Sequence, residues 1–186
     1  MAKIAVSKTG IFPLALNMTT STPSSVSDAI PGAPARAFAA IFWGGLLAGI
    51  FDITQAFIGF GLLGAKPFRI LQHIAGGVFG ARSMQMGWRS AALGLIFHFT
   101  IAFTAAAVYY LASRMVRVLV EHAVLCGLLY GELVFLFMYF VVLPLSALGP
   151  AHFSTATYIT GPIGHTFLVG LPIALSVRRF AGARAA

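Results

Sequence analysis

Four long apolar segments constrain this chain more than any other feature of its sequence. They cover about residues 37–63, 90–112, 123–143 and 162–177. A helix needs ~20 apolar residues to cross the hydrocarbon core of a bilayer. The 186 residues are 59% hydrophobic and 9% charged, whereas roughly one quarter of the residues in soluble proteins are charged. A soluble domain of this size could not bury so many apolar side chains. The segments therefore predict an all-α integral membrane protein, a bundle of four transmembrane helices.

Three prolines predict where two of these helices begin or end and where one is kinked. Pro144 is expected to end the third span, and Pro162 suits the first turn of the fourth, where its missing N–H costs nothing. Pro172 lies inside the fourth span and is expected to kink it.

The basic residues predict the orientation of the bundle. The formal net charge is +8, and most Lys and Arg residues flank the apolar segments, where membrane proteins carry their anchors. With four spans and a cytoplasmic N-terminus, one side carries Lys3, Lys8, Arg36, Arg114, Arg117, Arg178, Arg179 and Arg184. The other side carries Lys66, Arg69, Arg82 and Arg89. A fifth span would remove this excess of basic residues inside, so both termini are expected in the cytoplasm. The sequence lacks a basic stripe interleaved with aromatic residues, which is the pattern expected for a nucleic-acid partner.

Two kinds of segment lie outside the predicted spans. Residues 1–34 are rich in Ser and Thr toward their end and predict a flexible tail rather than a signal peptide, and residues 181–186 form a short second tail. Residues 35–180 are then a single membrane domain. Within it, residues 67–80 are amphipathic and too short to cross, which predicts an interfacial or re-entrant element. Its expected apolar side is Phe68, Leu71, Ile74, Ala75, Val78 and Phe79, and its expected polar side is Arg69, Gln72, His73, Gly76 and Gly80.

A faint internal repeat links the two halves of the domain. Gly45 with Gly49, and Gly127 with Gly131, form GxxxG pairs in the first and third spans, where helix backbones can approach closely. The second and fourth spans carry His98-Phe99-Thr100 and His165-Thr166-Phe167. These matches fit a parallel repeat of two helical hairpins, and they also fit chance similarity between apolar sequences. The GxxxG pairs are expected to serve helix packing and self-association.

The chain also resembles a known family in these segments. GLLAG in the first span, HFTIAFTAAAVYY in the second, GLLYG followed by PLSALGP in the third, and GPIGHTFLVG in the fourth are similar to the YagU-like family of small bacterial inner-membrane proteins. The resemblance covers most of residues 42–179. It implies a bacterial inner-membrane location and a shared bundle, with no established biochemical activity. It places His98 and His165 on matching histidines, and Asp52 and Glu132 where other members can have small residues.

A few polar residues inside the spans are the candidate functional residues. Asp52 and Glu132 lie near the middle of the first and third spans. His98 and His165 lie a little over one turn outward from the centres of their spans, at similar depth, and Gln55 is a further candidate in the first span. An ionisable group at the bilayer centre costs ~2.5–3.5 kcal/mol on insertion scales, so it is expected to face the bundle interior. Thr54, Thr100, Thr104, Tyr130 and Thr166 could complete a polar seam.

Three interpretations of these residues remain open. In the first, Asp52 and Glu132 form a proton- or cation-binding pair of a small transport or relay protein, with His98 and His165 along the path. In the second, the polar groups fix helix packing in a structural or accessory protein that supports the envelope or a larger complex. In the third and most remote, His98 and His165 are axial ligands of a b-type haem.

Enzymatic chemistry has no support in the sequence. It contains no GxSxG elbow, phosphate loop or HExxH pattern. Cys126 is the only cysteine, which excludes an intrachain disulfide and a cysteine metal cluster. We therefore expect a protein that is not an enzyme and carries no cofactor or metal. Its expected partners are the lipid bilayer and a second copy or a membrane complex.

Overall fold

A computed structural model describes residues 32–149 and 161–181 of the chain. All regular secondary structure in these residues is helical. The chain divides into a unit of residues 1–30 and a unit of residues 31–186, and the described residues belong to the second unit. Most of the predicted tails, at 1–34 and 181–186, therefore lie outside the described residues.

The helices follow the four apolar segments closely. The elements are α1 (Ala33–Leu62), α2 (Pro67–Phe79), a 3₁₀ helix (Gly80–Gln85), α3 (Trp88–Met115), α4 (Val118–Glu121), α5 (Ala123–Phe137), a π-helix (Met138–Val142), α6 (Leu143–Leu145), a second π-helix (His165–Gly170) and α8 (Leu171–Ala181). Residues 161–164 are helical and precede the second π-helix, so residues 161–181 form one continuous element, here called the last helix. A proline lies in the first turn of α1, after Gly32, whose φ of 89° is a left-handed conformation that glycine adopts without strain.

Three helices of the described part are long and apolar enough to cross a membrane: Pro34–Leu62, Trp88–Met115 and Ala123–Leu145. They correspond to the first three predicted spans. The last helix contains the fourth predicted span but does not belong to this group, because polar residues and two arginines shorten its apolar run. Large apolar side chains are exposed on the outer faces, such as Val108 at 52%, Leu129 at 65% and Leu133 at 60%. An apolar surface of this kind suits contact with lipid.

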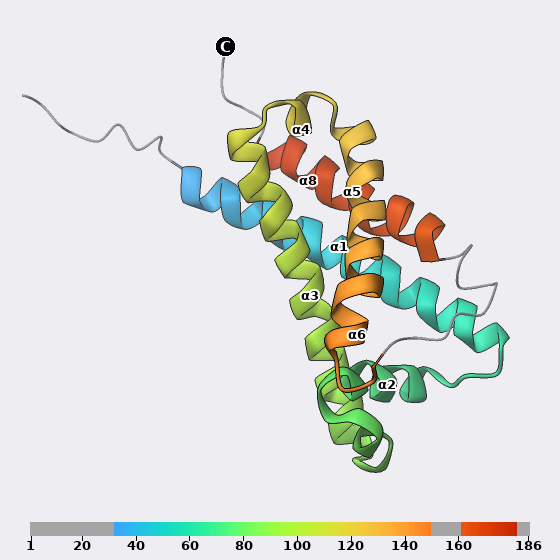
Figure 1. Ribbon diagram of the computed structural model, residues 1–186. Helices are drawn as coiled ribbons and strands as arrows, with labels where there is room; N and C mark the ends of the chain where they lie inside the picture. The colour runs from blue at the N-terminus through green and yellow to red at the C-terminus, as the bar shows by residue number, and fades with distance from the viewer. Residues whose placement is uncertain (1–31, 150–160, 182–186) are drawn as a thin grey trace, which may run out of the picture. The chain divides into compact units, whose positions relative to one another are not determined.

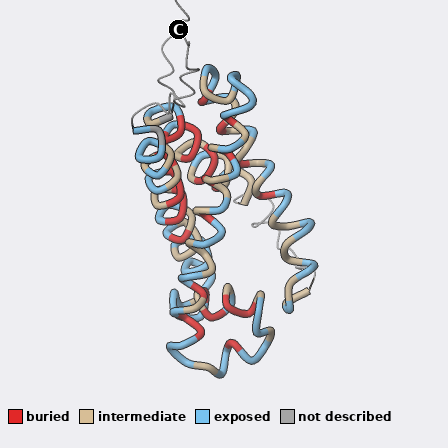
Figure 2. The backbone as a smooth tube through the Cα atoms, turned by 90° about the vertical axis from the view of Figure 1, so that its left-hand side faces the viewer, coloured by how far each residue is buried: buried red, intermediate tan, exposed pale blue. Residues whose placement is uncertain are grey.

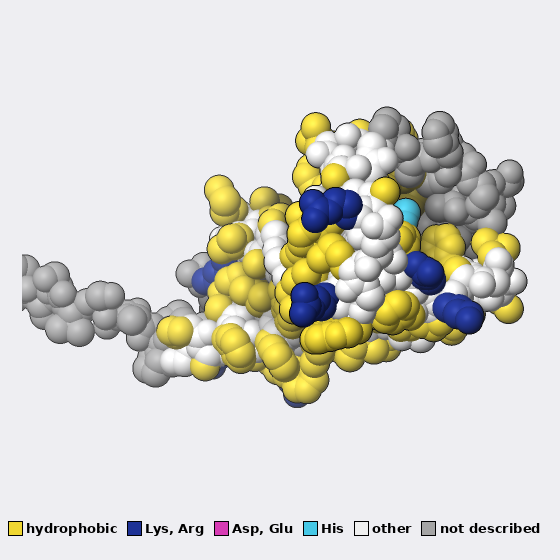
Figure 3. Space-filling model, turned by 90° about the horizontal axis from the view of Figure 1, so that it is seen from below, with side chains coloured by type: hydrophobic (Ala, Val, Ile, Leu, Met, Phe, Trp, Pro, Cys, Tyr) yellow, Lys and Arg dark blue, Asp and Glu magenta, His cyan; other side chains and the backbone are white. Residues whose placement is uncertain are grey.

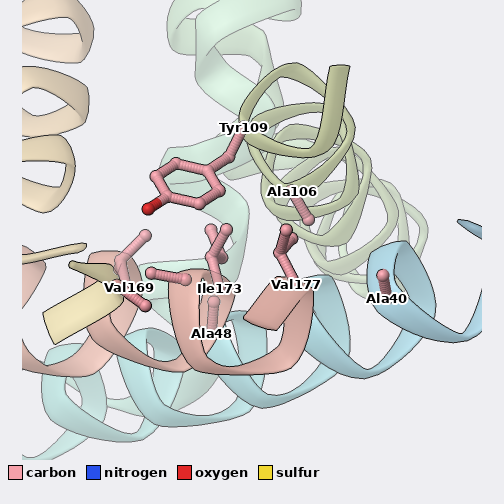
Figure 4. Close-up of a cluster of buried hydrophobic side chains, with 9 residues drawn as sticks. Ala40, Ala48, Ala106, Tyr109, Val169, Ile173 and Val177 are labelled. Atoms are coloured by element: carbon pink, nitrogen blue, oxygen red, sulfur yellow. The ribbon is translucent and has the colours of Figure 1, made fainter. Parts of the chain in front are cut away.

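The last helix packs against α1, α3 and α5 (Figure 1). Its residues Ile173, Ala174 and Val177 have no exposed surface. They meet Ala40 and Ala48 of α1 and Ala106 and Tyr109 of α3 in the main hydrophobic core (Figure 4), and buried residues line the faces between the helices (Figure 2). One face of the last helix is thus buried against the other helices, whereas Phe167 and Leu175 on its outer face are exposed.

Three pairs of packed helices run in opposite directions. Gly45 and Gly49 of α1 lie against Phe103 and Phe99 of α3, in reverse order. In the same way, Gly127 of α5 lies against Ala174 of the last helix, whereas Gly131 lies against Thr166. The last helix is therefore antiparallel to α5 and, by the contacts of Gly44 with Ile173 and of Asp52 with His165, to α1.

The third helix ends one residue after Pro144, close to its predicted end. It continues through α6 to Leu145, and the π-helix Met138–Val142 precedes the proline. Pro172 has the same setting, because the π-helix His165–Gly170 ends two residues before it. A proline ring clashes with the carbonyl four residues earlier in an α-helix. A wider π turn moves that carbonyl away, so each helix passes its proline.

The predicted amphipathic segment is helix α2, but its faces differ from the prediction. Gln72 and Gly76 are buried, whereas Phe68, Val78 and Phe79 are exposed. The Gln72 side chain donates to the carbonyl of Gly87 at 3.0 Å and to the Ser90 hydroxyl at 3.2 Å. A buried amide with its hydrogen bonds made fits an inward position, while apolar side chains suit an outward position facing lipid.

The end of the molecule that contains α2 carries basic and apolar side chains together (Figure 3). Its exposed basic residues are Lys66, Arg69, Arg82 and Arg89. No acidic side chain is visible on the described part of this face (Figure 3). Basic and apolar side chains in combination suit the interface between headgroups and acyl chains.

The close approach of α5 and the last helix provides a test of this packing. A Cβ atom on Gly170 would overlap the carbonyl oxygen of Gly127 and lie 2.6 Å from Cα of Gly131. Overpacking of this kind costs ~1–3 kcal/mol. Gly170→Val should therefore lower the free energy of unfolding in detergent or bicelles by about that amount.

Gly59→Ala is the matched control, because no atom lies within 4 Å of a Cβ at that position of α1. It should leave the unfolding free energy unchanged or raise it slightly. Equal stability of Gly170→Val and the unsubstituted protein would contradict the packing described here.

Candidate functional site

The candidate site lies where the last helix passes between the acids of α1 and α5. Nδ1 of His165 lies 3.8 Å from Oδ1 of Asp52. The side chains are 21% and 22% exposed, respectively. At 3.8 Å the contact is too long for a direct hydrogen bond. It is a Coulombic contact that becomes an ion pair when the imidazole is protonated.

A backbone carbonyl fixes the tautomer of neutral His165. Nδ1 lies 3.1 Å from the carbonyl oxygen of Gly161. A carbonyl only accepts, so Nδ1 carries the hydrogen and donates. The other nitrogen, Nε2, is then the one that can take up a proton. The ring of Phe135 lies edge-on to the imidazole with 5.3 Å between centroids.

Glu132 of α5 contacts the next residue of the last helix. The Thr166 hydroxyl donates to Oε2 of Glu132 at 3.4 Å. The two acids were expected to form a pair with each other. The contacts recorded for the described residues instead lead from each acid to one of two consecutive residues, His165 and Thr166. The acids thus flank the last helix on two sides.

Gly131 holds the peptide between these two residues close to α5. A Cβ at Gly131 would overlap the His165 carbonyl oxygen and lie 2.7 Å from Cα of Thr166. The GxxxG pair of the third span therefore positions the candidate site directly. All four predicted packing glycines, Gly45, Gly49, Gly127 and Gly131, are buried within the chain. Self-association would have to use another surface.

Gln55 extends the site by one turn of α1. It follows Asp52 by three residues, a spacing that places both side chains on the same face of a helix. A Cβ on Gly164 would lie 2.6 Å from the Gln55 amide carbon. The missing side chain at Gly164 thus makes room for this amide against the last helix.

His98 has a different role from His165. Its Nε2 lies 2.9 Å from the carbonyl oxygen of Gly49, and because a carbonyl only accepts, Nε2 donates this hydrogen bond between α3 and α1. Gly49 precedes Asp52 by three residues, so His98 and His165 meet α1 at about the same depth. The predicted similar depth of the two histidines agrees with this geometry. The haem alternative gains no support, because Nε2 of His98 already binds the backbone.

Of the threonines in the expected polar seam, Thr166 joins the site through Glu132, and the other three do not. Thr54, Thr100 and Thr104 donate to carbonyls four residues earlier in their own helices, and all three are exposed. Tyr130 does link helices, since its hydroxyl donates to the carbonyl of Ala105 in α3 at 2.7 Å.

Sequence reasoning missed Tyr109, the largest fully buried side chain of the described residues. Its hydroxyl donates to the carbonyl of Leu119 at 2.8 Å, which ties α3 to α4. Its ring lies edge-on to Tyr130 at 4.9 Å. Tyr109 and Tyr110 are adjacent in an apolar run, and the sequence alone does not indicate which of them faces inward.

The candidate site contains residue types that commonly take part in proton transfer. Within residues 32–149 and 161–181, three or more His, Cys, Asp or Glu side chains do not come together in a group that could hold a metal ion. The Asp52–His165 contact, by contrast, joins a carboxylate to an imidazole, and an imidazole can gain or lose a proton under physiological conditions.

Comparison with protein-family models, with curated proteins and with solved structures found no match to this chain.

The His98 hydrogen bond can be tested by its contribution to stability. His98→Leu removes the bond to Gly49 while keeping an apolar side chain of similar size. Interhelical hydrogen bonds in membrane proteins average ~0.6 kcal/mol and reach ~1.7. The unfolding free energy in bicelles should fall by an amount in that range.

Thr104→Ala is the control for this substitution, since Thr104 is exposed and bonds only its own helix. It should leave the unfolding free energy nearly unchanged. The bond between α1 and α3 would be refuted if His98→Leu were no more harmful than Thr104→Ala.

Proposed function

We propose that this chain is a small four-span inner-membrane protein that transports or relays protons through Asp52 and His165. The observation that carries the proposal is the contact between the Asp52 carboxylate and the His165 imidazole, at 3.8 Å, between α1 and the last helix. Ionisable side chains inside membrane bundles commonly mark proton and ion pathways.

His165 and Asp52 have different roles in this proposal. Nε2 of His165 takes up and releases the proton, because Nδ1 donates to Gly161. Asp52 stabilises the imidazolium that forms. Glu132 and Gln55 supply the next polar groups on either side of the last helix. The π-helix that begins at His165 supports a functional role, because π turns within helices occur frequently at functional sites.

The four-span topology is part of the proposal. It is supported by the antiparallel order of contacts, in which the last helix reverses the direction of α1 and α5. With the last helix as a fourth span, Arg114, Arg117, Arg178 and Arg179 belong to the cytoplasmic side, as the excess of basic residues inside requires. The bacterial inner membrane is the location implied by the resemblance to the YagU-like family.

A duplicated hairpin also belongs to the proposal. In both pairs of helices the second glycine of the GxxxG motif lies against the histidine cluster. Gly49 accepts from His98 and contacts Phe99, and Gly131 contacts His165 and Thr166. The acids are not equivalent in the two halves, because Asp52 follows its glycine by three residues and Glu132 by one.

A structural or accessory role is the second candidate. The hydrogen bonds of His98 to Gly49 and of Tyr130 to Ala105 favour it, because both join spans without any group that must change protonation. Such a protein would support the envelope or a larger membrane complex.

Proton flux into liposomes separates the two candidates. The purified protein is reconstituted with a trapped pH-sensitive dye, and a potassium gradient with valinomycin drives proton entry. The unsubstituted protein should acidify the lumen faster than protein-free liposomes. Asp52→Asn and His165→Gln should each reduce the rate to the protein-free level. The first removes the carboxylate that stabilises the imidazolium, and the second removes the imidazole that takes up the proton.

Glu121→Gln is the matched control, since it also neutralises one acid. Glu121 is exposed and contacts Arg117 in the short connection between α3 and α5. Its flux should equal that of the unsubstituted protein. Flux at the protein-free level before any substitution, or full flux in Asp52→Asn, would favour the structural role.

A further inference from the structure

A groove runs along the outside of the bundle between α1 and the last helix. Its volume is about 960 Å³, and it is lined on the α1 side by Trp43, Leu47 and Phe51. Phe167 and Leu175 line it from the last helix. The lining is apolar and open to the surroundings, since Trp43 is 45% exposed and Phe167 is 53% exposed.

The two ends of the groove differ in charge. Arg178 and Arg179 line one end, whereas the other end reaches Phe51, next to Asp52 at mid-span. Both arginines are exposed. The ion pairs recorded between described residues are Arg117–Glu121 and Asp52–His165, so neither Arg178 nor Arg179 has a carboxylate partner there.

The length of the groove fits one leaflet of a bilayer. Residues 43–51 of α1 span ~12 Å and residues 167–179 of the last helix span ~18 Å, at 1.5 Å per residue. One leaflet contributes ~15 Å of hydrocarbon to a core of ~30 Å. The end with Arg178 and Arg179 therefore lies at headgroup depth when the end with Phe51 and Phe167 lies near the bilayer centre.

We propose that this groove binds an anionic phospholipid. One acyl chain lies along Trp43, Leu47 and Phe51, and the phosphate binds the guanidinium groups of Arg178 and Arg179. Arginine presents a planar fork of donors that matches phosphate oxygens. Basic sites between transmembrane helices on the cytoplasmic side recognise anionic headgroups in this way. The site is separate from the Asp52–His165 contact and does not depend on proton transport.

Tryptophan fluorescence tests this site directly. The chain has two tryptophans, Trp43 in the groove and Trp88 at the start of α3. In the Trp88→Phe protein, Trp43 is the single reporter. The protein is reconstituted in two kinds of phosphatidylcholine vesicle. One contains a small fraction of phosphatidylglycerol brominated along an acyl chain, and the other contains the same fraction of phosphatidylcholine brominated in the same way. Brominated phosphatidylglycerol should quench Trp43 more strongly than brominated phosphatidylcholine.

The substitutions Arg178→Gln and Arg179→Gln together should abolish this preference. Arg114→Gln with Arg117→Gln is the matched control, because it removes one exposed arginine from the last turn of α3 and one from the connection to α5, and it should retain the preference. The reporter control is Trp43→Phe, in which substitution of Arg178 and Arg179 should leave the quenching of Trp88 unchanged.

Three results would overturn the proposal. Equal quenching by the two lipids would show that the groove holds ordinary bilayer lipid. Equal loss of the preference in both pairs of arginine substitutions would assign it to general surface charge. Absence of quenching by either lipid would show that a protein surface, such as a second copy of the chain, covers the groove.

Discussion

The bundle depends on the close approach of α5 and the last helix at Gly127, Gly131 and Gly170. The last helix carries polar side chains, two prolines and two arginines, so lipid is a poor environment for much of its length. It becomes stable in the bundle because α1, α3 and α5 pack against its buried face, and the glycines let its backbone touch that of α5. In a membrane, van der Waals contact of this kind replaces the hydrophobic driving force between helices. The same contact at Gly131 sets the positions of His165 and Thr166, so packing and the candidate site are one arrangement.

The prolines act on the site through the same helix. Pro144 and Pro172 each follow a π-helix by two residues. Because a proline ring leaves no room for the carbonyl four residues earlier, the preceding turn widens. In the last helix that wider turn begins at His165, which also bonds the carbonyl of Gly161 through its ring. Pro172, seven residues after His165, thus affects the backbone conformation at His165.

The sequence predicted the helices well and their rotations poorly. Long apolar runs between basic residues have few alternatives, so the first three spans agree with α1, α3 and the α5–α6 helix. The face of α2 was wrong for a physical reason. A hydrophobic pattern assumes that polar residues face outward, but beside lipid the outward side is apolar, and Gln72 is buried with its hydrogen bonds made. The direct pairing expected for Asp52 and Glu132 depended on how each helix turns about its axis. That rotation is set by contacts such as Gly49 with Phe99, which no single helix encodes.

The polar groups inside the bundle are of two kinds: neutral donors, which helix packing explains, and carboxylates, which packing alone does not require. Neutral donors satisfy the structural need, as Tyr130, Tyr109 and His98 do by binding backbone carbonyls. Each such bond contributes on the order of 1 kcal/mol or less. A carboxylate at mid-depth costs ~2.5–3.5 kcal/mol on insertion scales, more than one such bond returns. Asparagine or glutamine would make the same contacts at lower cost. The carboxylates of Asp52 and Glu132 therefore fit the proposed role, which needs a charge or a removable proton.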